Sequence, residues 1–260
     1  MIREIFSKNQ LDTSGDFRFR GKEPGRLENF SDAVFALAIT LLLISTSPPV
    51  NFDQIKRFTY ELLPFLLCIT LIILIWREHF IFFLRYGLRD GKMIALNTLF
   101  LVIVLFYVYP LKFLAKLILG PLAQIVNNQS LVEEIQGMIK GEDMGQLMII
   151  YGVGAAAVFL VLMQMYRYAL KRADDLELNE IERFDTRSSI RLNLLMALVP
   201  MLSVIMAAIF QNSWLAGPIS GFTYMLYTPL MFGHGRIVER KRKKLIETLT
   251  IESNPQTAIE

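Results

Sequence analysis

Polar side chains that a membrane would normally exclude gather where the first long apolar segment of the chain begins. This segment opens with Arg26, Ser31 and Asp32 and continues through twelve apolar or weakly polar residues. A hydroxyl and a carboxylate at a helix start satisfy backbone amides that lack partners and favour the positive end of the helix dipole. The alternative is a functional carboxylate, because ionisable side chains inside membrane spans are costly and often carry function.

Three further polar or amphipathic side chains fall in the next two apolar segments. Trp76 and His79 are three residues apart, which places them on one face of a helix, and Asn97 lies in the third segment. Taken singly, each is explained by ordinary hydrogen bonding between helices or by an aromatic side chain at the membrane surface. Taken together with Asp32, they predict one buried network in which Asp32 joins the first helix to His79 and Asn97.

A helical wheel of the first apolar segment separates an aliphatic face from the carboxylate. One narrow stripe has Thr40 at its edge and consists of Arg26, Phe30, Ala33, Leu37, Leu41 and Ile44. At about 100° per residue, Asp32 lies roughly 140° from this stripe, with Ala36 and Leu43 beside it. The wheel therefore predicts an aliphatic face and, on the far side of the helix, a carboxylate and Leu43 that pack against other helices.

The composition indicates that these segments are membrane spans. Hydrophobic residues make up 53% of the 260 residues, the mean hydropathy is +0.42, and residues 93–111, 144–166 and 192–235 contain no Asp, Glu, Lys or Arg. A bilayer core needs about 20 helical residues, and six segments satisfy this length. We expect spans at about 28–47, 60–83, 93–114, 146–168, 189–210 and 214–232. This all-α membrane protein cannot be a soluble enzyme or a disordered chain, and its one cysteine, Cys68, excludes a disulfide scaffold.

The distribution of positive charge predicts the orientation. With both termini inside, cytoplasmic segments hold 22 of the 27 Lys and Arg residues, as the positive-inside rule requires. We therefore predict a cytoplasmic segment at 1–25, a six-helix transmembrane domain at 26–233 and a basic cytoplasmic helix and tail at 234–260. The net charge of +3 then reflects topology rather than nucleic acid binding, and Arg236 to Lys244 are expected near anionic lipid headgroups.

The polar residues form a recognisable pattern. Arg26, Phe30-Ser31-Asp32, Ala36 and Thr40 read as R-x-x-x-F-S-D-x-x-x-A-x-x-x-T, followed by Trp76, His79 and Asn97. This pattern resembles the signature of the endosomal and lysosomal transmembrane potassium channels and their prokaryotic homologues. The resemblance is close over the first three spans and rests on span number and topology beyond them. A single motif with six spans resembles a prokaryotic single-repeat form.

The resemblance implies a potassium-selective channel in a bacterial cell membrane. It places the first helix around a central axis, with Leu37 as the narrowest point, Leu41 and Ile44 as further apolar rings and Thr40 as a source of hydroxyls. The sequence has no T-V-G-Y-G segment, whose carbonyls replace water around potassium in other channels. One such helix cannot surround a pore, so the resemblance implies a homotetramer. It implies permeant potassium and no cofactor, and it makes Asp32 structural rather than ion-binding.

Two other functions stay open at this stage. A secondary transporter could use Asp32 and His79 as titrating groups, and Gly152, Gly154 and Gly217-Pro218 in the later spans are compatible with broken transporter helices. A membrane-embedded enzyme would need clustered catalytic groups, and the sequence contains no such cluster within its spans. We therefore expect no enzymatic activity.

Overall fold

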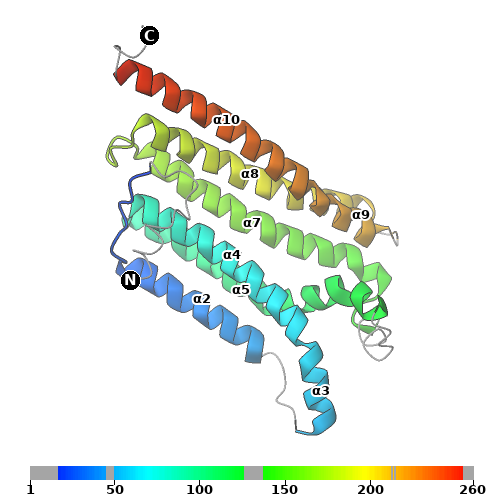
Figure 1. The fold of residues 1–260 in the computed structure, drawn as a ribbon. Helices are drawn as coiled ribbons and strands as arrows, with labels where there is room; N and C mark the ends of the chain where they lie inside the picture. Colours follow the sequence, from blue (N-terminus) through cyan, green and yellow to red (C-terminus); the bar gives the residue numbers. More distant parts are fainter. Residues whose placement is uncertain (1–16, 45–49, 126–136, 212, 214, 254–260) are drawn as a thin grey trace.

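The computed structural model describes residues 17–44, 50–125, 137–211, 213 and 215–253, and in these ranges the chain forms helices and no strands. The helices and 3-10 turns are α2 (Arg26–Ile44), α3 (Phe52–Tyr60), α4 (Leu62–Tyr86), α5 (Gly91–Ile125), η1 (Gly141–Asp143), α7 (Met144–Lys171), α8 (Glu180–Ile209), α9 (Ala216–Phe222), η2 (Thr223–Leu226) and α10 (Tyr227–Ser253). The long helices lie side by side in one elongated bundle (Figure 1).

Five helices in the described ranges are long and apolar enough to cross a membrane. They are α2, α4, α5, α7 and α8, and each contains most of one predicted span. Two helices run well past the predicted spans, because α5 continues to Ile125 and α8 begins at Glu180. The predicted end of the first span at Ser47 lies outside the described residues.

The last predicted span, 214–232, is not one regular helix. Its described residues fall in α9, the 3-10 turn η2 and the start of α10. Pro229 has no N–H to donate to the carbonyl of Met225, so α-helical hydrogen bonding cannot run unbroken through this stretch. α10 then continues to Ser253, and the predicted boundary at 233/234 falls inside this helix.

The connections lie at the two ends of the bundle (Figure 1). α2 begins, α10 ends, and the α4–α5 and α7–α8 connections lie at one end, whereas α3 lies at the other. The α4–α5 connection turns at Gly87, whose φ of 59° is left-handed and suits a residue without a side chain. The α7–α8 connection ends in a capping box formed by Asn179 and Glu182.

Close backbone contact joins α7 to α8. A Cβ on Gly152 would collide with the side chain of Val204 and lie only 3.1 Å from the carbonyl oxygen of Pro200, both on α8. Pro200 itself lies inside α8 and removes the N–H that would bond Met196, but the hydroxyl of Tyr227 donates to the Met196 carbonyl at 2.8 Å. The lost backbone hydrogen bond is therefore replaced by one from a side chain of α10.

Candidate pore helix and its polar network

α2 has one buried face and one exposed face. The buried face packs against α4 and α5 and consists of Glu28, Ser31, Val34, Phe35, Ala38 and Leu42. The exposed face includes Phe30, Leu37 and Ile44, with Leu37 at 51% and Ile44 at 69% exposure, whereas Leu41 is half-buried. Most of the predicted aliphatic stripe is therefore uncovered in the single chain, as a pore-lining face needs to be.

The uncovered face is wider than the predicted stripe, and Leu43 belongs to it. Leu43 was expected to pack on the opposite side from Leu37, but it is 50% exposed. A wheel gives the angles between residues and does not show which side the neighbouring helices cover. Because α2 packs mainly on α4 and α5, the exposed arc extends from Leu37 through Thr40 to Leu43.

Thr40 lies in the middle of the exposed face. Its hydroxyl donates to the carbonyl of Ala36 at 2.9 Å, within the same helix. The hydrogen of this hydroxyl is thus turned toward the backbone, and the oxygen lone pairs remain acceptors. Such an oxygen can contact a cation that has lost part of its water.

Three of the motif residues form a buried chain of hydrogen bonds between α2, α5 and α4. Asn97 donates to the Ser31 hydroxyl at 2.9 Å, and its side-chain oxygen lies 2.7 Å from Nε2 of His79. Ser31 in turn donates to the carbonyl of Leu27 at 2.8 Å. The His79 ring is stacked on Phe100, with ring centroids 5.3 Å apart, so the network is enclosed by aromatic side chains.

Asp32 does not belong to this chain, and the prediction that it pairs with His79 and Asn97 is wrong. The side chain of Asp32 is exposed and accepts a hydrogen bond from Nε1 of Trp76 at 2.8 Å. Ser31 occupies the position in the network that was predicted for Asp32. Successive residues on a helix are about 100° apart, so only one of these neighbours can face the buried side.

The first turn of α2 contains a buried carboxylate that the sequence analysis did not single out. Glu28 accepts the backbone N–H of Gly25 at 3.2 Å and forms an ion pair with Arg89 at 3.2 Å, whereas Arg26 is exposed. Arg89 comes from the α4–α5 connection and also donates to the carbonyl of Glu23 at 2.5 Å. The acidic first turn was visible in the sequence, but its distant basic partner was not.

A second ionic cluster fixes the same connection to α7. Asp90 pairs with Arg172 at 2.9 Å and accepts hydrogen bonds from the Tyr168 hydroxyl and, at 3.1 Å, the Met93 N–H. Burial by itself raises the pKa of Asp90, but these hydrogen bonds and the charge of Arg172 bring it below its ordinary value. The carboxylate therefore stays ionised at neutral pH and links α5 to α7.

Comparison with known proteins identifies the family. A family model described as "Endosomal/lysosomal potassium channel TMEM175" matches residues 26–107, which hold the whole polar motif. A potassium channel from Marivirga tractuosa is 43% identical over 250 residues, covering 95% of this chain and 100% of that protein. The chain belongs to the TMEM175 family.

Solved TMEM175 structures support the fold. A crystal structure of the potassium channel MtTMEM175, in a threonine-to-alanine variant bound to a nanobody–MBP fusion, is 43% identical and has a TM-score of 0.76, covering 87% of this chain and 98% of that one. A potassium-selective homologue from Chamaesiphon minutus is 20% identical with a TM-score of 0.50, covering 80% of this chain and 96% of that one. The second match shows similarity of fold alone.

Family membership makes this chain an integral protein of a bacterial membrane that takes part in ion transport, and not an enzyme. Potassium is the permeant ion that the family implies. Within the described ranges, no three His, Cys, Asp or Glu side chains gather as metal ligands would. The TMEM175 resemblance seen in the first three spans thus extends over nearly the whole chain.

Proposed function

We propose that this TMEM175 protein is a potassium-preferring channel in which four copies of the chain arrange their α2 helices around one central pore. The observation that carries the proposal is the exposed face of α2. It combines apolar Leu37 and Ile44 with Thr40 and Asp32, and such a mixture does not suit a surface that only contacts lipid.

The exposed face supports an aliphatic constriction in place of a T-V-G-Y-G filter. Leu37, Leu41 and Ile44 from four chains form three apolar rings, with Leu37 and Ile44 about 10 Å apart along the helix axis. An apolar ring that excludes water blocks ions, and the widened ring conducts. Thr40 lies between the outer rings, where its hydroxyl oxygen contacts the partly dehydrated ion.

The proposed orientation places both termini and the 1–25 and 234–260 segments in the cytoplasm, with residues 26–233 as the transmembrane channel domain. The excess of Lys and Arg supports this orientation. It is also supported by Figure 1, where α2 begins and α10 ends at the same end of the bundle. The sixth crossing is then made by α9, η2 and the start of α10 together.

Anionic lipid is the further partner that we propose for α10. Arg236, Arg240 and Lys244 are exposed and four residues apart, so they follow one face of the helix. On another face, Arg242 pairs with Asp185 of α8 at 3.2 Å. This ion pair holds α10 against the bundle while the basic face remains available to headgroups.

Substitution of Leu37 tests the pore assignment. Leu37→Ser makes the narrowest ring wettable, so potassium conductance should rise and discrimination against sodium should fall. Leu198→Ser is the matched control, because Leu198 lies on α8 and is 46% exposed. Reversal potentials in mixed potassium and sodium, measured on reconstituted protein, decide the matter. If Leu37→Ser conducts and selects ions like the parent, the assignment of α2 as the pore-lining helix is wrong.

A coupled transporter that uses Asp32 and His79 is the second candidate, and the broken sixth crossing is the observation that favours it. However, the hydroxyls at this break are bonded to nearby carbonyls. Ser203 donates to the Ser220 carbonyl at 3.0 Å, and Thr223 donates to the same carbonyl at 2.6 Å. The channel is therefore preferred, and discrete single-channel current steps separate it from saturable, proton-dependent flux.

A further inference from the structure

The segment that precedes α2, residues 17–25, packs across the ends of other helices, and we refer to it as the strap. The backbone N–H groups of Arg20 and Gly21 donate to the carbonyls of Arg85 and Leu84, at 3.3 and 3.0 Å, at the end of α4. A Cβ on Gly21 would collide with the carbonyl of Phe83, so the approach requires glycine. Phe17 is buried against Tyr86, which anchors the other end of the strap.

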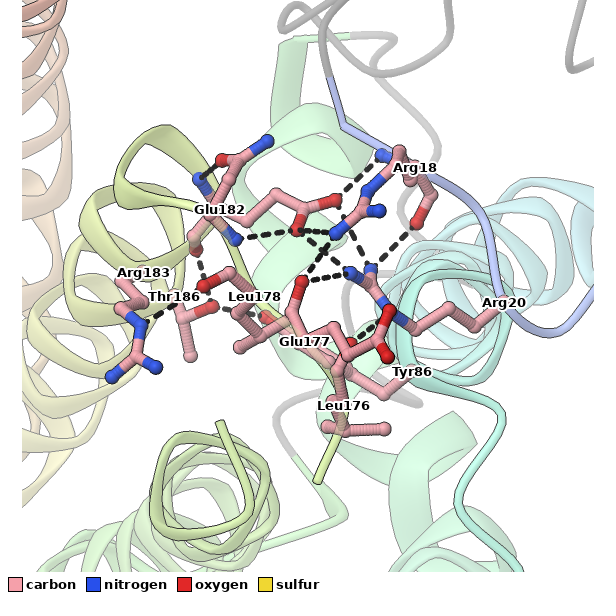
Figure 2. A network of polar contacts seen from close by, with 10 residues as sticks. Arg18, Arg20, Tyr86, Leu176, Glu177, Leu178, Glu182, Arg183 and Thr186 are labelled. Carbon is pink, nitrogen blue, oxygen red and sulfur yellow. Dashed lines mark hydrogen bonds and ion pairs between the residues drawn. The ribbon is translucent and has the colours of Figure 1, made fainter. Parts of the chain in front are cut away.

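The strap also binds a buried carboxylate on α8 (Figure 2). Glu182 is fully buried and accepts hydrogen bonds from two nitrogens of the Arg20 guanidinium, at 2.7 and 3.1 Å, and from the backbone N–H of Arg18 at 2.8 Å. Two further donors are the backbone N–H of Asn179, at 3.0 Å, and the guanidinium of Arg18, at 3.5 Å. A buried carboxylate is tolerated only when it is paired and hydrogen-bonded in this way.

Arg20 holds the α7–α8 connection at the same time. Its Nε donates to the carbonyl of Leu176 at 2.7 Å, and its NH2 donates to the carbonyl of Glu177 at 3.2 Å (Figure 2). A planar guanidinium with five donors can make these bonds together, and a lysine cannot. Next to it, Tyr86 of α4 and Thr186 of α8 share a hydrogen bond of 2.7 Å, which ties the two helices at the same level.

Capping the start of α8 does not by itself require that Glu182 be buried and paired with Arg20. A capping box uses the glutamate only to accept one backbone N–H, and it works on an exposed helix end. Here the glutamate is closed off from water and receives a cation from a segment 162 residues earlier. The strap continues directly into α2, whose own packing is against α4 and α5. The Arg20–Glu182 contact thus ties the start of α2 to α8.

We propose that Glu182 is a positioning residue for the pore helix. Through Arg20 it fixes the strap that leads into α2 against α8 and thereby sets the equilibrium between conducting and non-conducting positions of α2. This inference rests on the proposed pore-lining role of α2. A contact made in only one of two positions shifts the equilibrium between them, and such coupling commonly amounts to about 5- to 150-fold.

Glu182→Gln tests the proposal in the reconstituted full-length channel. Glu180→Gln is the matched control, because it makes the same change in the same helical turn at an exposed side chain. In single-channel recordings, Glu182→Gln should change the open probability by about fivefold or more and leave the unitary conductance and the potassium/sodium reversal potential as in the parent. Hydrogen exchange in residues 26–29 should accelerate only in Glu182→Gln.

A second variant keeps the test decisive if Glu182→Gln assembles poorly. Arg20→Lys retains the charge and loses the guanidinium geometry, so it should change the open probability in the same direction by a smaller factor. Parent-like open probability in an assembled variant overturns the proposal. Failure of both variants to assemble overturns it as well, because the contact would then serve folding alone.

The Leu37→Ser result separates this inference from the function on which it rests. If Leu37→Ser alters permeation and Glu182→Gln gates like the parent, the pore assignment stands and the positioning role is wrong. If Leu37→Ser is inert, the pore assignment fails, and an altered open probability in Glu182→Gln can no longer be assigned to the position of a pore helix.

Discussion

The helices on the two sides of the bundle are held together by different means. α2, α4 and α5 are joined by the buried chain of Ser31, Asn97 and His79. α7 and α8 are joined by close backbone approach, in which Gly152 leaves no room for a side chain beside Pro200. In a lipid environment apolar area alone does not drive helices together, so both interhelical hydrogen bonds and small residues serve this purpose.

The difference explains how α2 can be held in one orientation while one of its faces stays uncovered. Close packing requires contact along the length of both helices, as between α7 and α8. A directional hydrogen bond needs only one site on each helix and fixes the rotation of α2 about its own axis. The face that carries Leu37 and Thr40 can then remain uncovered in the single chain, as the proposed pore requires.

The largest loss of stability is expected from a substitution that prevents the close packing of α7 and α8. Gly152→Leu forces a branched side chain into Val204 and the carbonyl of Pro200, and it should lower stability by about 3 kcal/mol or more. Gly221→Leu is the control, because a Cβ there meets nothing within 4 Å. Thermal melting followed by size-exclusion chromatography measures both. Equal melting of the two variants would show that α7 and α8 are not closely packed.

An intermediate effect is expected in the polar network. Asn97→Ala leaves His79 and Ser31 without their partner, and it should cost about 1–3 kcal/mol for each buried group left unsatisfied. Asn193→Ala makes the same change at a buried asparagine that donates to the Ser189 carbonyl of its own helix, so it should cost less. Denaturation of both variants in the same detergent gives the difference. A larger cost at Asn193 would contradict the comparison.

The smallest effect is expected at Asp32, whose side chain is exposed. Asp32→Ala removes the acceptor of the Trp76 N–H and should lower thermal stability or tetramer yield by the equivalent of about 1 kcal/mol, with ion preference nearly unchanged. Asp32→Asn keeps an acceptor oxygen and should resemble the parent. A stable Asp32→Ala tetramer with an altered reversal potential would instead make Asp32 a pore-lining residue.

Much of the fold follows from the sequence because length and hydropathy limit the choices. Uncharged segments near the length of a span can only be buried or lipid-facing helices, and all but the last predicted span lie on a single apolar helix. The last predicted span is divided between α9, η2 and α10, an irregularity that hydropathy does not register because it takes no account of the missing N–H of Pro229. The residues of the polar network were also predictable, since polar side chains in such segments need partners.

The partners themselves were less predictable. Local angles could not decide whether Ser31 or Asp32 faces the bundle, nor that Leu43 stays uncovered, because the answer depends on where α4 and α5 lie. The sequence does contain the capping signature Asn179-x-x-Glu182. It gives no sign that Arg20 completes this site, since 162 residues separate the two side chains.

The same separation has a consequence for synthesis. Among the long helices of the described residues α2 is synthesised first, but Arg20 of the strap before it cannot bind Glu182 until 162 further residues have been made. At about 5–20 residues per second, this wait lasts roughly 10–30 s. Throughout that interval the buried partners of Arg20 do not yet exist. The Arg20–Glu182 ion pair is therefore among the last contacts of the strap to form, and in a chain truncated before α8 the strap keeps only its contacts with α4.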